Sequence, residues 1–427
     1  MERWTPDRVP VDLAIIGGGP AGAAAALEAR RRGLKVAIWE SGRFPRHKVC
    51  GEFVSAESLS WLQREIPTAM ARSTVIRRAE FIGRGGRRHR FTLPSPARGL
   101  SRFVLDEALW QAAIRSGAET CEGTAIRRVF RCSTDAGSSR ARSAEFRAAA
   151  LLPVTTHATL ANRRLWEVEP AKGTRRSARV LLVACGRWWS LEGIPSPARE
   201  QLTTAPWLGV KAHFTGVPPS DAVEMYFFPG GYCGLAPIEE GLLNVCCLVH
   251  RSLTRNLSAG ALADCALWLR KVARHPALDA RLRHATQVSE TLATAPVQPA
   301  RWRADHTGAL LAGDAAGFLD PFTGDGISQA LHAGQVAADA VARACRDRET
   351  LLVASDAYQR QLGYAVGRSY KVAGLLRLLV RAPAGLQEFA ARVLSGCAVR
   401  LFRETRWRGD PGIEASSGGA TCERSEL

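Results

Sequence analysis

Glycines and one acid near the start of the chain have spacings that suit phosphate and ribose binding. In the stretch VDLAIIGGGPAGAAAALEARRRGLKVAIWE, an apolar run precedes Gly17, Gly19 and Gly22, which match the pattern G-x-G-x-x-G. The first glycine of this pattern permits a tight turn, the second lets backbone approach a pyrophosphate, and the third lets a helix pack closely on a strand. Glu40 follows Gly22 by 18 residues, where a carboxylate accepts hydrogen bonds from a ribose.

The residues around these glycines predict the elements that would position them. The β-branched run at 11–16 predicts a buried strand, 21–32 predicts a helix, and 35–40 predicts a second strand. Strand, glycine turn, helix and strand make a βαβ unit, in which the start of the helix attracts an anion. Such units bind FAD, NAD or NADP, and the unit alone does not choose among them.

A second motif repeats this arrangement near the other end of the chain. In GALLAGDAAGFLDPFTGDGISQALHAGQVAADAV, residues 308–312 predict a strand and Asp314 lies directly after it. Gly324 and Gly326 precede a helix predicted at 327–344. A carboxylate at a strand end and a helix start facing an anion again indicate a cofactor site.

This second stretch resembles the second FAD fingerprint of the p-hydroxybenzoate hydroxylase and geranylgeranyl reductase superfamily. The resemblance implies that Asp314 holds the ribityl chain and that 321–326 line the isoalloxazine ring. An arginine before a helix, Arg102 in GLSRFVLDEALWQAAIRSGAE, would lie against the FAD. The cofactor-binding residues expected from the motifs and the resemblance are Gly17, Gly19, Pro20, Ala21, Gly22, Glu40, Ser41, Lys48, Cys50, Gly51, Arg102, Gly186, Gly313, Asp314, Pro321, Gly324, Asp325, Gly326 and Ile327.

The segment SGRFPRHKVCGEFVSAESL resembles the P-x-x-K-x-C-G segment of the geranylgeranyl reductases, which runs along the flavin. Lys48, Cys50 and Gly51 carry the match, and Glu52 replaces a further glycine or aspartate. Cys50 is therefore expected to be a catalytic thiol, a proton donor or redox-tuning group, if Lys48, His47 or the flavin lowers its pKa. The alternative is a small buried apolar residue, the commonest role of free cysteine.

The stretch EMYFFPGGYCGLAPIEEGLLNVCCLV resembles the Y-x-W-x-F-P region that roofs the substrate cavity in those reductases. It keeps Tyr226 but lacks the tryptophan. The pattern predicts strands at 225–228 and 242–249 around a turn at 229–231. Tyr226 is the second candidate proton donor, and packing in a core is the alternative.

One motif departs from the superfamily. Its usual A-D-G motif is replaced by Ala184-Cys185-Gly186, which argues against a hydroxylase that draws electrons directly from NADPH. The neighbouring Arg187 is a candidate replacement that would stack on a ring or pair with a phosphate. NAD(P)H stays open as the electron donor.

The sequence therefore predicts an FAD-dependent oxidoreductase, with reduction of a C=C bond in a lipophilic, isoprenoid or polyketide-like substrate favoured. Three alternatives remain: a monooxygenase acting on an aromatic or polyketide substrate, a flavin halogenase, of which Gly51-Glu52-Phe53 is a partial echo, and a non-catalytic flavin-binding protein at a membrane. The missing W-x-W-x-I-P motif argues against the halogenase.

The composition of the chain limits the binding partners, metal sites and locations that we expect for the protein. The net charge of +18 is almost all arginine, since lysine occurs six times, and no aromatic-interleaved basic motif accompanies it, so nucleic-acid binding is not expected. The eleven cysteines show no zinc spacing, and no metal site is expected. No leader or span of about 20 apolar residues is apparent, so a cytoplasmic location is expected. An apolar stripe flanked by arginines at 356–406 is a candidate lid or a peripheral membrane contact, and simple packing against the flavin domain is the alternative.

The expected fold class is α/β, with a Rossmann-like FAD-binding domain, an antiparallel β-sheet substrate domain and C-terminal helices. The FAD-binding domain is expected to be discontinuous, formed by 1–75, 100–190 and 290–345. The substrate domain is expected at 76–99 and 191–289, a helical region at 346–409 and a disordered tail at 410–427. A long surface connection is expected between 132 and 172.

Overall fold

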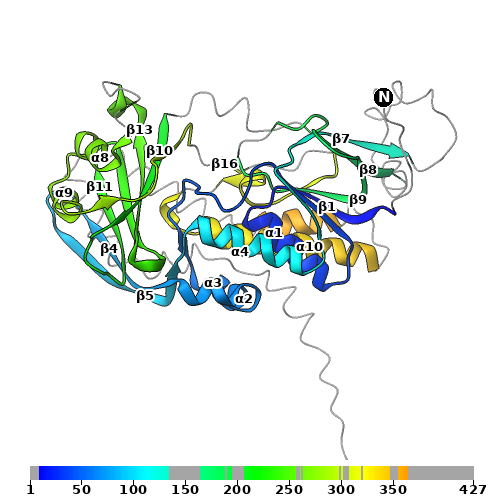
Figure 1. Ribbon diagram of the computed structural model, residues 1–427, viewed down its shortest axis with the longest axis horizontal. Coiled ribbons are helices and arrows are strands. Elements are labelled where there is room, and N and C mark those ends of the chain that lie inside the picture. The colour runs from blue at the N-terminus through cyan, green and yellow to red at the C-terminus, as the bar shows by residue number, and fades with distance from the viewer. Residues whose placement is uncertain are drawn as a thin grey trace, which may run out of the picture.

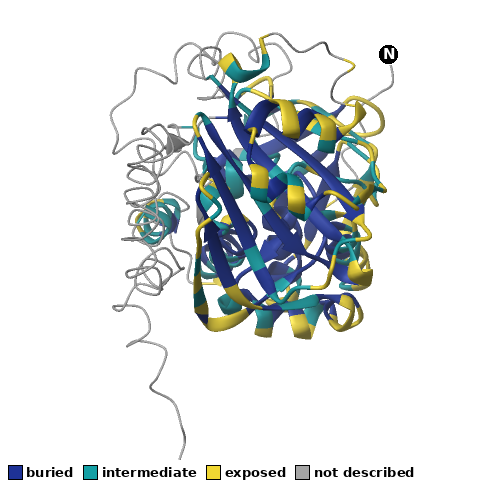
Figure 2. Ribbon diagram, turned by 90° about the vertical axis from the view of Figure 1, so that its left-hand side faces the viewer, coloured by how far each residue is buried: buried dark blue, intermediate teal, exposed yellow. Residues whose placement is uncertain are grey.

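The computed structural model places two sheets with helices between and around them (Figure 1). The residues that the structure describes are 9–133, 164–187, 190–194, 206–255, 260, 263–297, 300–301, 307–318, 321–346 and 354–363. Buried positions run along the strands, and exposed positions gather on loops and outer helix faces (Figure 2).

The first sheet carries both glycine motifs. Its strands lie in the order β6-β2-β1-β9-β8-β7, and β17 also pairs with β9. The pairs β1–β2, β1–β9, β2–β6 and β9–β17 are parallel, whereas β7–β8 and β8–β9 are antiparallel. The bounds are β1 Val11–Ile16, β2 Val36–Glu40, β6 Glu119–Glu122, β7 Ile126–Ser133, β8 Arg164–Pro170, β9 Arg176–Val183 and β17 Leu310–Leu311.

The second sheet is largely antiparallel, in the order β14-β10-β13-β12-β11-β4-β5-β3, with β15 also paired to β10. The one parallel pair along this path is β4–β11. The bounds are β3 Phe53–Val54, β4 Thr74–Ile82, β5 Arg88–Gly99, β10 Trp207–Thr215, β11 Ala222–Phe228, β12 Gly231–Pro237, β13 Leu243–His250, β14 Thr286–Gln287 and β15 Leu292–Thr294. A separate short pair joins β16 Ala300–Arg301 to β18 Gly317–Phe318.

Helices cover the outer faces and fix the strand ends. The bounds are α1 Pro20–Arg31, α2 Leu59–Glu65, α3 Pro67–Arg72, α4 Arg102–Arg115, α8 Cys265–Ala273, α9 Pro276–Arg281 and α10 Gly326–Arg346. Small alanines on α1 and α10 let these helices pack directly on each other and on β1. On the second sheet, α8 and α9 pack on one face through Trp268, Leu269 and Leu278, which leaves the other face toward the first sheet.

The α/β class, the βαβ unit and the antiparallel second sheet confirm the sequence-based expectation. Two local expectations were wrong. The turn after 228 leads into β12, a strand that the pattern missed, and 243–250 then pairs with β12. The expected surface connection at 132–172 contains β8, which pairs with β7 and β9. Gly234 and Pro237 weakened the strand signal of β12 because both residue types are uncommon in strands.

The expected domain bounds place most strands in the right sheet, but β3 and β15 lie in the second sheet although they fall in the segments assigned to the FAD-binding domain. Most of the expected helical region at 346–409 and the whole expected tail at 410–427 lie outside the described residues. Within the described residues, no helix is both long and apolar enough to cross a bilayer.

Candidate functional site

A cavity of about 790 Å³ lies between the two sheets and is lined by both glycine motifs. The expected cofactor-binding residues that line it are Gly17, Gly19, Pro20, Ala21, Glu40, Ser41, Lys48, Cys50, Gly51, Arg102, Gly186, Gly313, Asp314, Pro321, Gly324, Gly326 and Ile327. We call it the flavin cavity. Of the expected residues, Gly22 and Asp325 are buried and are not part of its lining.

The first glycine turn brings backbone close to backbone. Gly17 has a φ of +107°, and a Cβ built on it would lie 2.4 Å from the carbonyl oxygen of Ala184. A Cβ on Gly22 would lie 1.8 Å from the carbonyl oxygen of Gly17. Gly22 therefore does not line the cavity but shapes it, because the absence of a side chain lets α1 begin directly under the turn. The first turn of α1 then presents unpaired N–H groups toward the cavity.

Glu40 sits at the end of β2 and holds this turn in place. Its Oε2 accepts a hydrogen bond from Gly18 N at 2.9 Å, and its Oε1 accepts one from Gly42 N at 2.9 Å. Arg46 forms an ion pair with Oε1 at 2.7 Å. Burial raises the pKa of Glu40, but the Gly42 hydrogen bond and the Arg46 charge outweigh it, so the pKa is lowered and the carboxylate stays charged.

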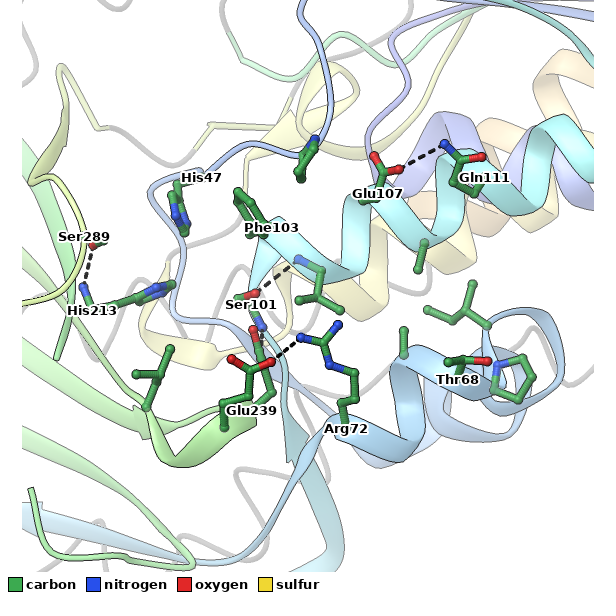
Figure 3. Close-up of a pocket in the computed structure, with 18 of the residues that line it drawn as sticks. His47, Thr68, Arg72, Ser101, Phe103, Glu107, Gln111, His213, Glu239 and Ser289 are labelled. Atoms are coloured by element: carbon green, nitrogen blue, oxygen red, sulfur yellow. Dashed lines mark hydrogen bonds and ion pairs between the residues drawn. The ribbon is translucent and has the colours of Figure 1, made fainter. Parts of the chain in front are cut away.

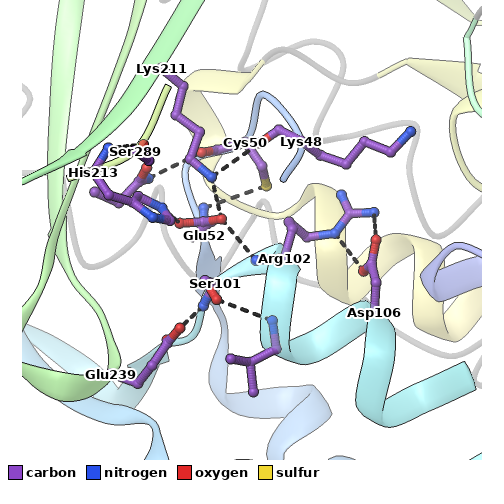
Figure 4. Close-up of polar contacts among 12 residues, drawn as sticks. Lys48, Cys50, Glu52, Ser101, Arg102, Asp106, Lys211, His213, Glu239 and Ser289 are labelled. Carbon is purple, nitrogen blue, oxygen red and sulfur yellow. Dashed lines mark hydrogen bonds and ion pairs between the residues drawn. The ribbon is translucent and has the colours of Figure 1, made fainter. Parts of the chain in front are cut away.

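Arg102 begins α4 and is fixed in one orientation (Figure 4). Its Nε and Nη2 donate to the two carboxylate oxygens of Asp106, each at 2.7 Å. Asp106 is 1% exposed, so this bidentate pair is held in the protein interior. A Cβ on Gly19 would lie 3.9 Å from Arg102 Nη2, which places the guanidinium beside the phosphate-binding turn.

The second motif supplies the opposite wall of the cavity. Asp314 lines it, and Arg187 Nε lies 3.9 Å from Asp314 Oδ2. The guanidinium of Arg187 stacks over the Phe318 ring, 4.2 Å from its centroid. Arg187 therefore stacks on a protein ring and pairs with a carboxylate in this structure, and its contact with the cofactor stays a prediction.

These features fit an FAD molecule. Bare backbone and a helix start at one end suit a pyrophosphate, and Glu40 suits a ribose. Asp314 at the second motif suits a polyol chain, and one continuous cavity joins the two motifs. Its volume is within the range of cofactor and ligand pockets. When bound, FAD supplies the two-electron chemistry, and the protein supplies binding, orientation and protons.

Cys50 lines the flavin cavity, as expected, but its pKa is shifted in the other direction. Burial raises the pKa of the thiol, and the nearby charge of Glu52 raises it further, whereas Arg102 opposes both. The lowered pKa on which the catalytic role depended is therefore not found. Cys50 is a neutral thiol near pH 7 and is not activated as a nucleophile, and its role as a proton donor stays a prediction.

We expect Cys50 to react with iodoacetamide at neutral pH more slowly than an unperturbed thiol does, because only the thiolate attacks and the raised pKa lowers the thiolate population. Peptide mass mapping of the time course measures this. Cys121, which is exposed, is the internal control. Modification of Cys50 faster than Cys121 would show that its thiolate is stabilised after all.

Tyr226 is not brought to the flavin cavity. Successive side chains of a strand point to opposite faces. Met225 lines the cavity, and Tyr226 is therefore turned toward α8 and α9, where it is fully buried and its hydroxyl donates to Glu224. Burial, and then the charge of Glu224, raise the pKa of Tyr226. This geometry corrects the expected donor role: Tyr226 is a core residue.

The sequence analysis missed a buried charge cluster under the segment that carries Cys50 (Figure 4). Glu52 is 0% exposed, Lys211 1% and His213 3%. His213 Nε2 lies 2.6 Å from Glu52 Oε2, and Lys211 Nζ donates to Glu52 Oε1 and to the carbonyl oxygen of Lys48 at 3.2 Å. Asn244 Nδ2 donates to the carbonyl oxygen of Cys50 at 3.1 Å. The cluster ties the Cys50 segment to the second sheet.

A sequence signal for this cluster existed. Lys211 and His213 are two residues apart in the apolar run WLGVKAHFT, so they lie on one face of β10, opposite to Val210 and Phe214. Two ionisable groups on the inner face of a strand require a buried counter-charge. Glu52 has a φ of +56°, in the left-handed region that non-glycine residues seldom adopt.

Glu52 is charged at neutral pH. Burial alone would raise the pKa of this carboxyl group. The hydrogen bond with His213 and the charge of Lys211 outweigh burial, so its pKa is lowered.

Comparison with known proteins agrees with this site. Residues 11–65 match the family model of pyridine nucleotide-disulphide oxidoreductases, which covers the first glycine motif and the Cys50 segment. The chain is 27% identical, over 92% of its length and 91% of the relative, to digeranylgeranylglycerophospholipid reductase 2 of Methanopyrus kandleri. The chain is an FAD-dependent oxidoreductase similar to the geranylgeranyl reductases.

Two further likenesses extend this result. The oxidoreductase is 26% identical to the menaquinone reductase of Mycobacterium tuberculosis, over 87% of this chain and 84% of that protein. The solved structure of the flavin-dependent brominase Bmp2 has the same fold, with a TM-score of 0.66, 19% identity and coverage of 96% of this chain and 99% of that one. The fold is therefore shared by flavin enzymes of different chemistry.

Proposed function

We propose that this oxidoreductase reduces a C=C bond in a lipophilic, isoprenoid-like substrate with electrons from its reduced flavin. The observation that carries the proposal is the apolar part of the flavin cavity, which faces the second motif. The side chains that line this part are Phe81, Met225, Tyr232, Leu248, Val297, Phe318 and Phe322. A chamber of aromatic and aliphatic side chains beside a flavin site suits a chain with few polar groups.

The residues of the cavity supply what such a reaction needs besides electrons. Asp106 holds Arg102, and the Glu52 cluster holds the Cys50 segment, so both are fixed before substrate arrives. The neutral thiol of Cys50 is available as an acid for the carbon that does not receive hydride. The apolar walls exclude water from the reacting atoms. The reductase names of the relatives support this choice of reaction.

The electron donor and the cellular context belong to the same proposal. We propose NAD(P)H as the source of electrons, directly or through a partner flavoprotein. A peripheral membrane contact through 346–409 would give access to a substrate that is dissolved in lipid. We also propose a cytoplasmic location. Nucleic acid is not proposed as a partner.

The test uses the purified protein with its flavin reduced under anaerobic conditions. It is mixed in detergent micelles with a geranylgeranylated lipid, which carries no quinone ring that could accept the same two electrons. We expect flavin reoxidation without oxygen and a product heavier by one H₂ per reduced bond, measured by mass spectrometry. The same reduced protein is then mixed with oxygen in the absence of substrate, where we expect slow, featureless reoxidation.

Cys50→Ser and Cys121→Ser form a matched pair for this test. Cys50→Ser is expected to slow product formation and leave the flavin spectrum unchanged, whereas Cys121→Ser, at an exposed position, should behave like the wild type. Rapid reoxidation by oxygen with a transient flavin species, together with hydroxylated product, would replace the proposal with monooxygenation. Bound FAD that no donor or substrate turns over would favour the non-catalytic protein.

A further inference from the structure

A second cavity, of about 890 Å³, lies between α3, α4 and the inner face of the second sheet (Figure 3). His47, Phe103, His213 and Glu239 are among its lining residues. Phe103 is 38% exposed and Val288, at the same cavity, is 51% exposed, so this cavity opens to solvent.

Three ionisable side chains connect the second cavity with the flavin cavity. Glu52 lines the flavin cavity only, His213 lines the second cavity only, and His47 lines both. The hydrogen bond of 2.6 Å between Glu52 Oε2 and His213 Nε2 therefore joins one cavity to the other. The ring of His47 meets His213 edge-on, with centroids 5.0 Å apart, and stacks on Phe103 at 4.8 Å.

The charges around this link come from several elements. Lys211 on β10 and the backbone N–H of Arg102 on α4 both donate to Glu52 Oε1, the latter at 2.8 Å. Glu239 accepts from Ser101 N at 2.8 Å beside the second cavity. Lys211 and Asn244 already tie the Cys50 segment to the second sheet, so the hydrogen bond from Glu52 to a histidine that lines the second cavity is not needed for that tie.

We propose that His213 and Glu52 form a proton path between the second cavity, which opens to solvent, and the flavin cavity. Reduction of a C=C bond breaks its π bond and forms two C–H bonds. Hydride, with two electrons from the reduced flavin, forms one, and a proton forms the other. His213 gives the proton on Nε2 to Glu52, and Glu52 gives it up inside the flavin cavity, where it restores the Cys50 thiol that has protonated the substrate carbon. Solvent that enters the second cavity then restores the proton of His213.

The catalytic part of this role rests on the proposed function, but the path itself is tested without any substrate. The reduced holoenzyme is mixed anaerobically with ferricyanide in weak buffer containing a pH-indicator dye. Each anionic reduced flavin loses two electrons to two ferricyanide ions and releases one proton. The absorbance of the flavin reports the rate at which electrons are lost. The absorbance of the dye reports the rate at which the proton arrives in solvent. In the wild type the two signals should coincide.

In His213→Gln, the amide still donates to Glu52 but carries no ionisable proton. We expect flavin oxidation at the wild-type rate and proton release slower by about 100-fold, the lower end of what a positioned side chain contributes to proton transfer. If His213 had only a structural role, its replacement would change the retention of FAD or the rate of flavin oxidation. It would produce no lag between the flavin signal and the dye signal. The matched control is His275→Gln, a buried histidine of neither cavity, where the signals should stay together.

If His213→Gln does not retain FAD, the variant Val288→Trp tests the proton path instead. Val288 is exposed at the second cavity, and its N–H donates to the carbonyl oxygen of His213 at 2.9 Å, so an indole there narrows the cavity beside His213 and removes no ionisable group. A lag in proton release supports the path. Coincident signals in His213→Gln, or in Val288→Trp where that variant decides, overturn it. Because no substrate is used, failure to reduce a C=C bond would leave this result intact.

Discussion

Gly22→Ala is expected to produce a folded protein that binds FAD much more weakly than the wild type does. The added Cβ would lie 1.8 Å from the carbonyl oxygen of Gly17, and this neighbour is backbone and cannot rotate away. The turn and the start of α1 must separate, which moves the N–H groups that face the cavity. Overpacking of this kind costs about 1–3 kcal/mol or more, which raises the FAD dissociation constant by about 100-fold or more at the upper end.

Fluorescence titration of the apoprotein with FAD measures this constant, and circular dichroism reports the fold. Gly260→Ala is the control, because Gly260 is exposed and a Cβ there meets nothing within 4 Å. The cost is smaller than the usual stability of a globular protein, so the variant should remain folded. Wild-type affinity in Gly22→Ala would mean that the cavity does not bind a pyrophosphate at this turn.

The contrast between the two cofactor motifs and the charge cluster shows what local sequence can reveal. The first motif lies within 30 consecutive residues, 11–40, and every requirement of the chemistry is local: a turn, a helix start and an acid at the next strand end. Hydrophobic periodicity therefore placed β1, α1 and β2 almost to the residue. The same holds for Asp314 and the start of α10.

Contacts between residues far apart in the sequence could not be predicted from local sequence patterns. Glu52 and Lys211 are far apart in sequence and meet only because β10 crosses beneath the Cys50 segment. The choice of face also had to come from the structure. Tyr226 and Met225 are equally plausible wall residues by pattern, and the pairing of β11 with β4 and β12 decides that Met225 faces the cavity. The pKa of Cys50 likewise depends on burial and on Glu52, which the local sequence around a cysteine does not reveal.

Glu52→Leu is expected to lower the free energy of unfolding by about 3–5 kcal/mol, the usual cost of removing one partner of a buried ion pair. Lys211 would remain in the interior without a counter-charge and His213 without its hydrogen-bond partner, since they are 1% and 3% exposed. Chemical denaturation followed by fluorescence measures the change. In Glu80→Leu, the partners Arg88 and Arg90 can turn to solvent, so that control should lose about 1 kcal/mol or less.

The double variant Glu52→Leu/Lys211→Met isolates the cause. It removes both charges and should regain most of the lost stability, because an apolar pair replaces a buried ion pair at little cost. If the double variant is as unstable as Glu52→Leu, then the loss comes from packing or from the left-handed backbone at residue 52, and the ion pair is not what stabilises the Cys50 segment.

The pH dependence of stability also distinguishes the effect of the Glu52 charge from the effect of the shape of its side chain. The pKa of Glu52 is lowered in the folded protein, below its ordinary value of 4.5. Its contribution to stability is therefore complete above that ordinary value and is lost as the pH falls through the lowered folded pKa. The stability difference between wild type and Glu52→Leu should be constant near neutral pH and shrink in acid. A difference that does not change with pH would mean that the carboxylate charge contributes nothing, and that Glu52 acts only through its shape.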